Sequence, residues 1–214
     1  GSEFVKYAER MIQEEITTRG EFYICPLYNL MIQNGSKIDI KEVDKMHLMG
    51  TPDELEFYLT HSLVKFGDKP IAICADHSGF DIKNKACDIL KSKGIKYVDY
   101  GTFVDKDCDY NDYVSQAVDA VNRGFSDYII AFCRTGQGVN IAGNKNKGIR
   151  AAVVYDEYAA EHAIRHNCAN YFSVPSRVIT SDTFSNMIDI WQQTTFDGGR
   201  HVPRITKAEF NESV

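Results

Sequence analysis

The sequence predicts a three-layer α/β/α domain with a five-stranded parallel sheet over residues 69–214, preceded by a small α+β extension. Two observations support this prediction. Short and almost continuous apolar runs recur along this region, as is typical of strands that are buried on both faces. Helical stretches separate these runs, and strands that alternate with helices indicate βαβ units. The predicted layering is therefore Rossmann-like.

The predicted elements follow one another in a regular order. Gly94 and Gly124 end two of the helices, because glycine readily adopts the left-handed conformation that closes a helix. A Gly-rich loop follows the third strand and leads into an Asn-rich helix start. The strands are expected over 71–74, 96–100, 128–133, 149–154 and 171–174, and the other helices up to Ser92, over 111–123, 156–166 and 183–193.

The N-terminal part differs in character. Residues 1–4 read as a cloning scar, and residues 5–68 are expected to form a separate segment, since the turn at 67–70 marks a domain boundary. This segment is too short and too poor in core residues to make a large domain by itself. Its expected elements are a helix over 5–17, a β-like run at 22–25, a helix over 27–34, a strand over 37–43 and a helix over 54–65.

Composition limits the function. The net charge of −6 and the pI near 5.5 argue against nucleic-acid binding, which needs a basic face. The sequence has no apolar run near 18 residues and no charged-then-apolar leader, so neither a membrane partner nor secretion is expected. Six cysteines form no Cys-x-x-Cys pair, which disfavours a zinc ribbon or a redox pair. We expect reduced thiols in a cytoplasmic protein.

The first candidate site follows the first predicted strand. In a parallel sheet, ligands bind beyond the carboxyl ends of the strands, and the sequence there is Asp76-His77-Ser78-Gly79. One interpretation is a capped helix start, with Asp76 or Ser78 as the N-cap. The other is that His77 also binds a ligand or transfers a proton.

The second candidate site follows the third predicted strand, where Cys133 precedes a loop that contains Gly136 and Gly138. The spacing matches neither a dinucleotide-binding motif nor a phosphate-binding P-loop. A loop that runs into a helix can still direct backbone N–H groups at an anion. Cys133 is either a buried thiol or a reactive one whose thiolate these N–H groups stabilise.

The third candidate site contains two clusters of cations. His166 and Asn167 end a predicted helix, where a histidine is often only a partner of the helix dipole. Arg200, His201 and Arg204 follow the last predicted helix. They form either a solvated cluster or a phosphate clamp, because arginine binds phosphate in fork geometry.

Together these motifs resemble the type B ribose-5-phosphate isomerase and galactose-6-phosphate isomerase family. The resemblance covers about residues 69–206 in one collinear stretch. The stretches that carry it are 75–80 (ADHSGF), 109–110 (DY), 133–138 (CRTGQG), 142–150 (AGNKNKGIR), 166–167 (HN) and 198–201 (GGRH).

The resemblance implies an aldose–ketose isomerase of small phosphorylated sugars, without metal or organic cofactor. Cys133 would be the base that moves a proton between C1 and C2 through a cis-enediolate. Dimers or tetramers would share each site between two subunits. The other implied roles are ring opening by Thr135 and His166, enediolate stabilisation by the amides around Gly136, Gly138 and Asn140, sugar or phosphate contacts from Asp76, His77, Tyr110 and Asn167, and phosphate binding by Arg200 and Arg204 with His77.

Some residues depart from the family pattern. Arg134 stands where the family usually has glycine, beside the reacting carbons, and Asn111 and Pro175 differ as well. Arg134 either contacts an acidic or longer substrate or turns outward. Two further hypotheses therefore stay open: an inactive sugar-phosphate-binding module that regulates another enzyme, and a different reaction on the same fold, such as epimerisation.

The extension resembles a different family. Residues 20–29 and 49–55 are similar to the C-terminal tail of sugar-phosphate nucleotidyltransferases, although the Gly-rich nucleotide-binding start is missing. This resemblance implies a longer bifunctional protein, with the isomerase beside a nucleotidyltransferase in the synthesis of an activated sugar.

Overall fold

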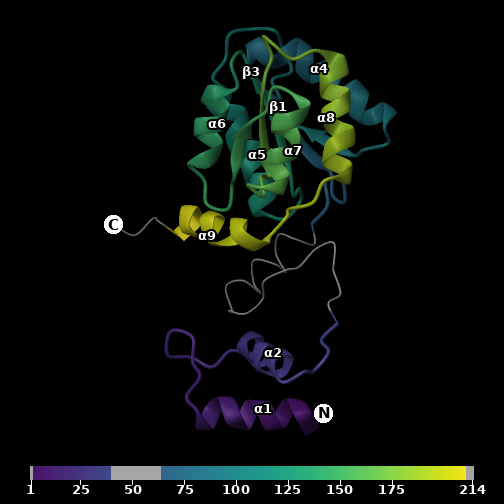
Figure 1. Ribbon diagram of the computed structural model, residues 1–214. Coiled ribbons are helices and arrows are strands. Elements are labelled where there is room, and N and C mark those ends of the chain that lie inside the picture. The colour runs from purple at the N-terminus through teal and green to yellow at the C-terminus, as the bar shows by residue number, and fades with distance from the viewer. Residues whose placement is uncertain (1, 40–63, 211–214) are drawn as a thin grey trace. The chain divides into compact units, whose positions relative to one another are not determined.

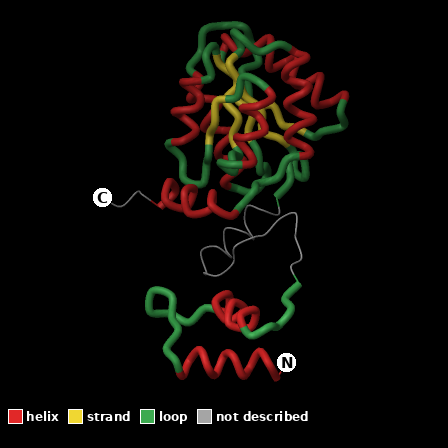
Figure 2. The backbone as a smooth tube through the Cα atoms, in the orientation of Figure 1, coloured by secondary structure: helices red, strands yellow, loops and turns green. Residues whose placement is uncertain are grey.

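The sheet is five-stranded and entirely parallel, with the order β2-β1-β3-β5-β4, so the predicted fold class is confirmed (Figures 1 and 2). The structure is a computed structural model that describes residues 2–39 and 64–210. The chain divides into two compact units, Gly1–Asp44 and Lys45–Val214, and the sheet lies in the second. Its strands are β1 (Ile71–Ala75), β2 (Tyr97–Asp99), β3 (Ile129–Cys133), β4 (Ala151–Val153) and β5 (Tyr171–Pro175).

Helices cover both faces of the sheet. Alternate residues of each strand point to opposite faces, so Ile73 and Ile130 belong to one apolar cluster and Cys74 and Ala131 to the other. The helices of the first face are α4 (Phe80–Ser92), α7 (Glu157–Arg165) and α8 (Ser181–Gln193), and those of the second are α5 (Tyr110–Asn122) and α6 (Gln137–Asn144). The strands and helices begin and end within a few residues of the positions expected from the sequence.

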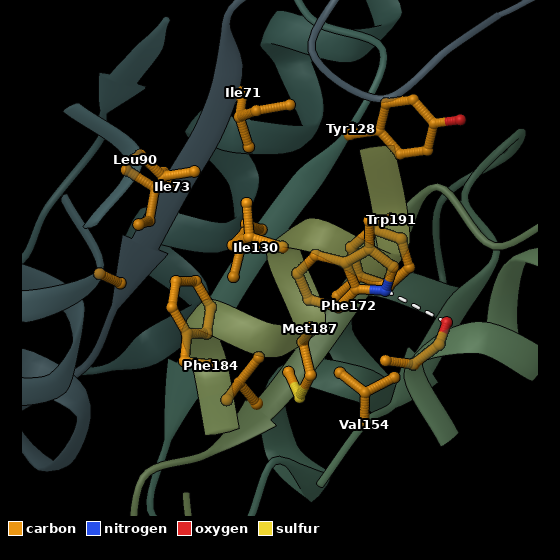
Figure 3. Close-up of a cluster of buried hydrophobic side chains, with 14 of the residues drawn as sticks. Ile71, Ile73, Leu90, Tyr128, Ile130, Val154, Phe172, Phe184, Met187 and Trp191 are labelled. Atoms are coloured by element: carbon orange, nitrogen blue, oxygen red, sulfur yellow. Dashed lines mark hydrogen bonds between the residues drawn. The ribbon is translucent and has the colours of Figure 1, made fainter. Parts of the chain in front are cut away.

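The larger cluster is built around aromatic rings (Figure 3). The Trp191 ring is fully buried and stacks on Phe172 with a centroid separation of 4.0 Å. Its Nε1 donates a hydrogen bond to the carbonyl oxygen of Ala160, so the one polar atom of the ring is satisfied. Phe66 contacts Trp191 and Tyr128, with centroids 5.4 and 5.2 Å away. The residues just before β1 therefore contribute to this core.

The topology of the sheet has a switch point between two neighbouring strands. β1 and β3 are adjacent, but the chain leaves β1 towards α4 on one face and β3 towards α6 on the other. Loops that diverge in this way open a crevice at the carboxyl edge of a parallel sheet. The crevice lies between the segments that follow Ala75 and Cys133.

The C-terminal segment packs against the opposite edge of the sheet. The short helix η3 (Gly199–His201) leads into α9 (Val202–Phe210), which lies across one end of the α/β unit in Figure 1. Arg150 anchors it by an ion pair from Nη1 to Glu209 (2.5 Å), while its Nε donates to the carbonyl of Cys168 (2.6 Å). An apolar cluster completes the contact and consists of Cys168, Phe196, Val202 and Ile205.

The N-terminal unit consists of α1 (Ser2–Gln13) and α2 (Ile24–Gln33). The β-like run expected at 22–25 is wrong, because the helix begins at Ile24 and Pro26 lies in its first turn, where proline is tolerated. The strand expected over 37–43 is not found in residues 37–39, and its remaining residues, like the helix expected over 54–65 up to residue 63, lie outside the described residues. No described helix is long and apolar enough to cross a membrane.

Candidate functional site

The loop after β1 places Asp76 and His77 at the carboxyl edge of the sheet. The Asp76 side chain accepts a hydrogen bond from the Gly79 amide (3.0 Å) and caps the 3₁₀ turn η2 (His77–Gly79). Burial raises the pKa of Asp76, and this hydrogen bond opposes the rise. The Nδ1 atom of His77 accepts from the Cys108 amide at 3.3 Å. His77 is therefore held by the loop that follows β2.

Cys133 is the last residue of β3 and is only 4% exposed. Its carbonyl oxygen accepts from the Ser176 amide (2.9 Å), and the carbonyl of the next residue, Arg134, accepts from the Arg177 amide (3.2 Å). These bonds tie the loop after β3 to the loop after β5. The Arg134 and Arg177 side chains are both exposed and have no acidic partner among the described residues. The two loops that these bonds join thus each carry an exposed arginine without an acidic partner among the described residues.

The start of α6 offers backbone donors beside Cys133. Gly136 is the N-cap with φ +74°, a conformation that glycine adopts without strain. The Gln137 amide donates to Thr135 Oγ1 (3.3 Å) and the Asn140 amide donates to the Gly136 carbonyl (3.2 Å). The two amides between them, those of Gly138 and Val139, have no acceptor among the described residues. They are the groups available to an anion.

Two close contacts fix the other groups of this edge. A Cβ at Gly138 would lie 2.8 Å from Cε1 of Tyr110, so only glycine lets this ring approach the loop. The side chain of Asn140 accepts from the buried hydroxyl of Ser173 at 3.3 Å. Because the Asn140 amide is already used within α6, its side chain, not its backbone N–H, is the part that can meet a ligand.

The remaining predicted residues lie at the opposite edge of the sheet. His166 caps the end of α7, and Asn167 follows it. Asn170, three residues later, accepts a hydrogen bond through its carbonyl from the amide of Ile129, the first residue of β3. Cys133 is four residues further along the same strand, and a rise of about 3.3 Å per residue separates the two levels by about 13 Å.

A cavity of about 740 Å³ lies at this second edge. It is bounded by the end of α7, the start of β4 and the α9 helix. Arg200 is exposed in η3, next to His201. The polar lining includes His166, Asn167, His201 and Arg204, together with Asn144, Asn146, Lys147, Arg150 and Glu209.

His166 and His201, which line this cavity, form a compact cluster with Asp197. Their potential ligand atoms lie within 4.8 Å of one another, a spacing that could hold a metal ion. However, Arg165 already binds the Asp197 carboxylate through Nε at 3.2 Å to both oxygens. Arg200 and Arg204 lie close enough to lower the pKa of His201, after the larger effect of burial. This excess of positive charge favours an anion such as phosphate over a cation.

Each chain thus carries two separate groups of the predicted residues. The cysteine edge comprises Asp76, His77, Tyr110, Cys133, Arg134, Thr135, Gly136, Gly138 and Asn140. The histidine edge comprises His166, Asn167, Arg200 and Arg204.

Comparisons with known proteins identify the family of the α/β unit. The profile of the Ribose/Galactose Isomerase family matches residues 71–208, nearly the whole described α/β unit. The chain belongs to this family. The ribose-5-phosphate isomerase B of Escherichia coli K12 is 37% identical over 137 residues, which cover 64% of this chain and 92% of that protein.

Solved structures show the same relationship. The ribose 5-phosphate isomerase of Thermotoga maritima is 38% identical and aligns with a TM-score of 0.64, covering 66% of this chain and 98% of that one. The type B ribose 5-phosphate isomerase of Trypanosoma brucei is 34% identical, also with a TM-score of 0.64, covering 67% and 99%. The matched region of this ribose/galactose isomerase family member begins at residue 71, so the N-terminal unit has no counterpart in the family profile.

Sequence reasoning missed two members of the histidine edge. Arg165 and Asp197 are 32 residues apart, and their pairing depends on how the last segment folds back onto α7. The sequence offers only a weak signal for them, namely that Asp197 directly precedes the Gly-Gly-Arg-His run.

Proposed function

We propose that this protein interconverts the aldose and ketose forms of a small phosphorylated sugar, a pentose 5-phosphate or a close relative, with Cys133 as the proton-transferring base. One observation carries the proposal. Cys133 ends β3 at the switch point between β1 and β3, and the loop that follows it leads to two backbone amides, of Gly138 and Val139, that have no acceptor among the described residues. A base beside free donors is what an enediolate needs, because negative charge develops on its oxygen.

The proposed chemistry relocates two protons, one from C2 to C1 and one from O2 to O1, and needs no external oxidant or reductant. The Cys133 thiolate takes the proton from C2 of the open-chain aldose, and the electron pair of that C–H bond forms the C1–C2 double bond. The carbonyl pair moves onto O1, where the Gly138 and Val139 amides stabilise it. The thiol then returns the proton to C1, using the electron pair of the C1–C2 double bond, while the proton of the O2 hydroxyl passes to O1. This leaves a ketone at C2 and a hydroxyl at C1. Thr135 and His166 would open the sugar ring beforehand by proton transfer at the ring oxygen.

A complete site requires a second copy of the chain. His166, Arg200 and Arg204 lie about 13 Å or more from Cys133 along the sheet direction of one chain, too far to reach the same small sugar directly. In a two-fold symmetric dimer, if the cysteine edge of one subunit meets the histidine edge of the other, symmetry repeats the same contact with the subunits exchanged, so the dimer has two such contacts. We infer that the histidine edge of one subunit completes the cysteine edge of its partner.

A substrate panel tests this function. Pentose and hexose phosphates are mixed with the enzyme, and aldose–ketose exchange is followed by NMR. Cys133→Ala should lower kcat by about 10²- to 10⁴-fold, the contribution of a positioned general base, while binding measured by calorimetry is retained. Cys25→Ala, which removes an exposed thiol of the N-terminal unit, is the control. Turnover that survives Cys133→Ala would refute the assigned base.

Arg134 is the specific observation behind the second candidate function. This exposed side chain next to Cys133 could block the reacting carbons, which would make the domain a sugar-phosphate-binding module. Tight binding without turnover for every sugar in the panel would favour the module. Deuterium entering C2 without ketose formation would indicate epimerisation.

The likeness of residues 20–29 and 49–55 to a nucleotidyltransferase tail supports a further part of the proposal. In it, the isomerase works beside a nucleotidyltransferase and supplies a sugar phosphate for activation. Isolation of the protein from its native cells, followed by an assay for nucleotide transfer to the ketose or aldose product, tests this part separately.

A further inference from the structure

We propose that Asp197 is a positioning residue that holds a proton on Nε2 of His166 and so leaves Nδ1 as the nitrogen that exchanges a proton with the sugar ring oxygen. His201 is the neutral ring on which His166 rests. The inference deepens the proposed function and rests on it, since it concerns the ring-opening step alone.

Asp197 is itself firmly placed. Its backbone amide donates to the carbonyl of Arg165 (2.9 Å), so the segment is tied to the last turn of α7. Its carboxylate accepts from Arg165 Nε through both oxygens at 3.2 Å. With backbone and side chain both held, Oδ2 lies 3.9 Å from Nε2 of His166. This separation is longer than a hydrogen bond, so the carboxylate acts on the ring through its negative charge, which favours the tautomer with the proton on Nε2.

The ring of His201 stacks on the ring of His166. The two rings are nearly parallel, with centroids 4.4 Å apart and an interplanar angle of 10°. His162 meets the edge of His166 at 4.7 Å, and its own Nδ1 lies 2.9 Å from the carbonyl of Tyr158. Rings packed on two sides restrict rotation of the His166 side chain.

Burial and nearby positive charge favour the neutral form of one of the two stacked rings, His201. His201 is only 7% exposed, and burial, His166, Arg200 and Arg204 together lower its pKa. His166 is 35% exposed at its side chain. Two stacked imidazolium ions would repel each other strongly, which favours the neutral form of the buried His201 ring.

The other charged groups around the pair leave Asp197 as the acidic partner. Arg165 is shared between Asp197 and Glu161 (2.9 Å), which lies one turn earlier on α7. Arg200 and Arg204 approach from η3 and α9 and have no acidic partner among the described residues. Asp197 is the only carboxylate in an ion-pair contact with His166 in the described part of the chain.

The test separates ring opening from proton transfer at carbon. A five-carbon 2-ketose 5-phosphate is always open-chain, because O5 is esterified and cannot close a ring. Exchange of its C1 hydrogen with D₂O reports enolisation without any ring step. Asp197→Asn keeps the side-chain shape and should slow the conversion of the cyclic aldose about tenfold or more, while C1 exchange of the ketose changes less than about twofold.

Asp189→Asn is the matched control, because Asp189 also forms an ion pair, with Lys93 at 2.6 Å, but on the exposed side of α8. It should leave both rates unchanged. An equal fall of both rates in Asp197→Asn, or no fall in either, would overturn the proposal. If the wild-type enzyme performs neither reaction, the proposed function fails instead.

His201→Phe provides an independent variant, since phenylalanine keeps a flat neutral ring in the stack. It should retain aldose conversion within a few-fold of the wild type, whereas His201→Ala should lose it. If His201→Phe loses as much activity as His201→Ala at equal thermal stability, His201 carries the proton or a metal ion, and the assignment to His166 and Asp197 is wrong.

Discussion

Two cysteines of neighbouring strands show how position decides the chemistry of a single residue. Cys74 lies inside β1, fully buried, and burial raises the pKa of its thiol. Cys133 lies on the same face of the sheet but ends its strand, and the free amides of Gly138 and Val139 lie in the first turn of α6, the next element of the chain. The same side chain is an inert core residue in one place and a candidate base in the other.

Arg134 is the residue that should decide substrate choice. Arg134→Gly removes a long cationic side chain beside the thiol, and we expect the ratio of kcat/KM values to shift towards ribose 5-phosphate over longer or acidic sugar phosphates. The same panel measured on Arg123→Ala, which alters an exposed arginine on α5, is the control. An identical substrate profile before and after Arg134→Gly would mean that the side chain points away from the site.

At the scale of elements, α7 links the two ends of the sheet. It starts from the loop after β4 at the carboxyl edge and ends with His166 at the amino edge. Its N-cap Asp156 accepts from the Ala159 amide at 2.7 Å, which satisfies one of the free donors of the first turn. The position of His166 therefore depends on a helix whose start lies at the other edge.

Loss of this cap should be measurable. Asp156→Ala should lower the free energy of unfolding by about 1 kcal/mol, which corresponds to a fall in Tm of about 2–4 °C for a domain of this size. Asp88→Ala, which changes an exposed residue inside α4, should stay within about 0.5 kcal/mol. Equal shifts in Tm for both variants in a thermal denaturation experiment would show that the Asp156 N-cap does not stabilise α7.

At the scale of the whole molecule, the separation of the cysteine and histidine edges predicts complementation between subunits. Cys133→Ala keeps a working histidine edge, and His166→Ala keeps a working cysteine edge. Each should be nearly inactive alone. After the two are unfolded and refolded together in equal amounts, random pairing should restore about one quarter of the wild-type activity, because half of the dimers contain one intact site of two.

One outcome of the complementation experiment would contradict the shared site. If the mixture stays as inactive as its components while light scattering shows that mixed dimers form, the two edges do not share a site. A mixture of Cys133→Ala with Thr135→Ala serves as the control, since both changes lie on the cysteine edge and no pairing can restore it.

The sequence alone was sufficient for the sheet and the helices that cover it, but not for α9, whose residues were read only as a cluster of cations after the last helix. Buried strands such as 128–133 are apolar throughout, and helices end at glycines. The hydrophobic pattern and the positions of the glycines therefore locate the elements. The extension was harder to predict: the aromatic run at 22–25 matches strand propensity, yet Ile24 and Cys25 begin a helix because Leu27 and Met31 pack against Tyr7 and Met11. Tertiary contact overrides local propensity in so small a unit.

For the site, the sequence by itself determined the groups that directly follow a strand. Asp76 and Cys133 could be placed at one edge because parallel strands all end there. Only the tertiary structure decided that His166 lies at the other edge, that Asn140 has already used its amide, and that Asp197 approaches His166. These facts depend on the path of α7 and on the return of the C-terminal segment, and contacts between residues far apart in the chain leave no periodic trace in the sequence.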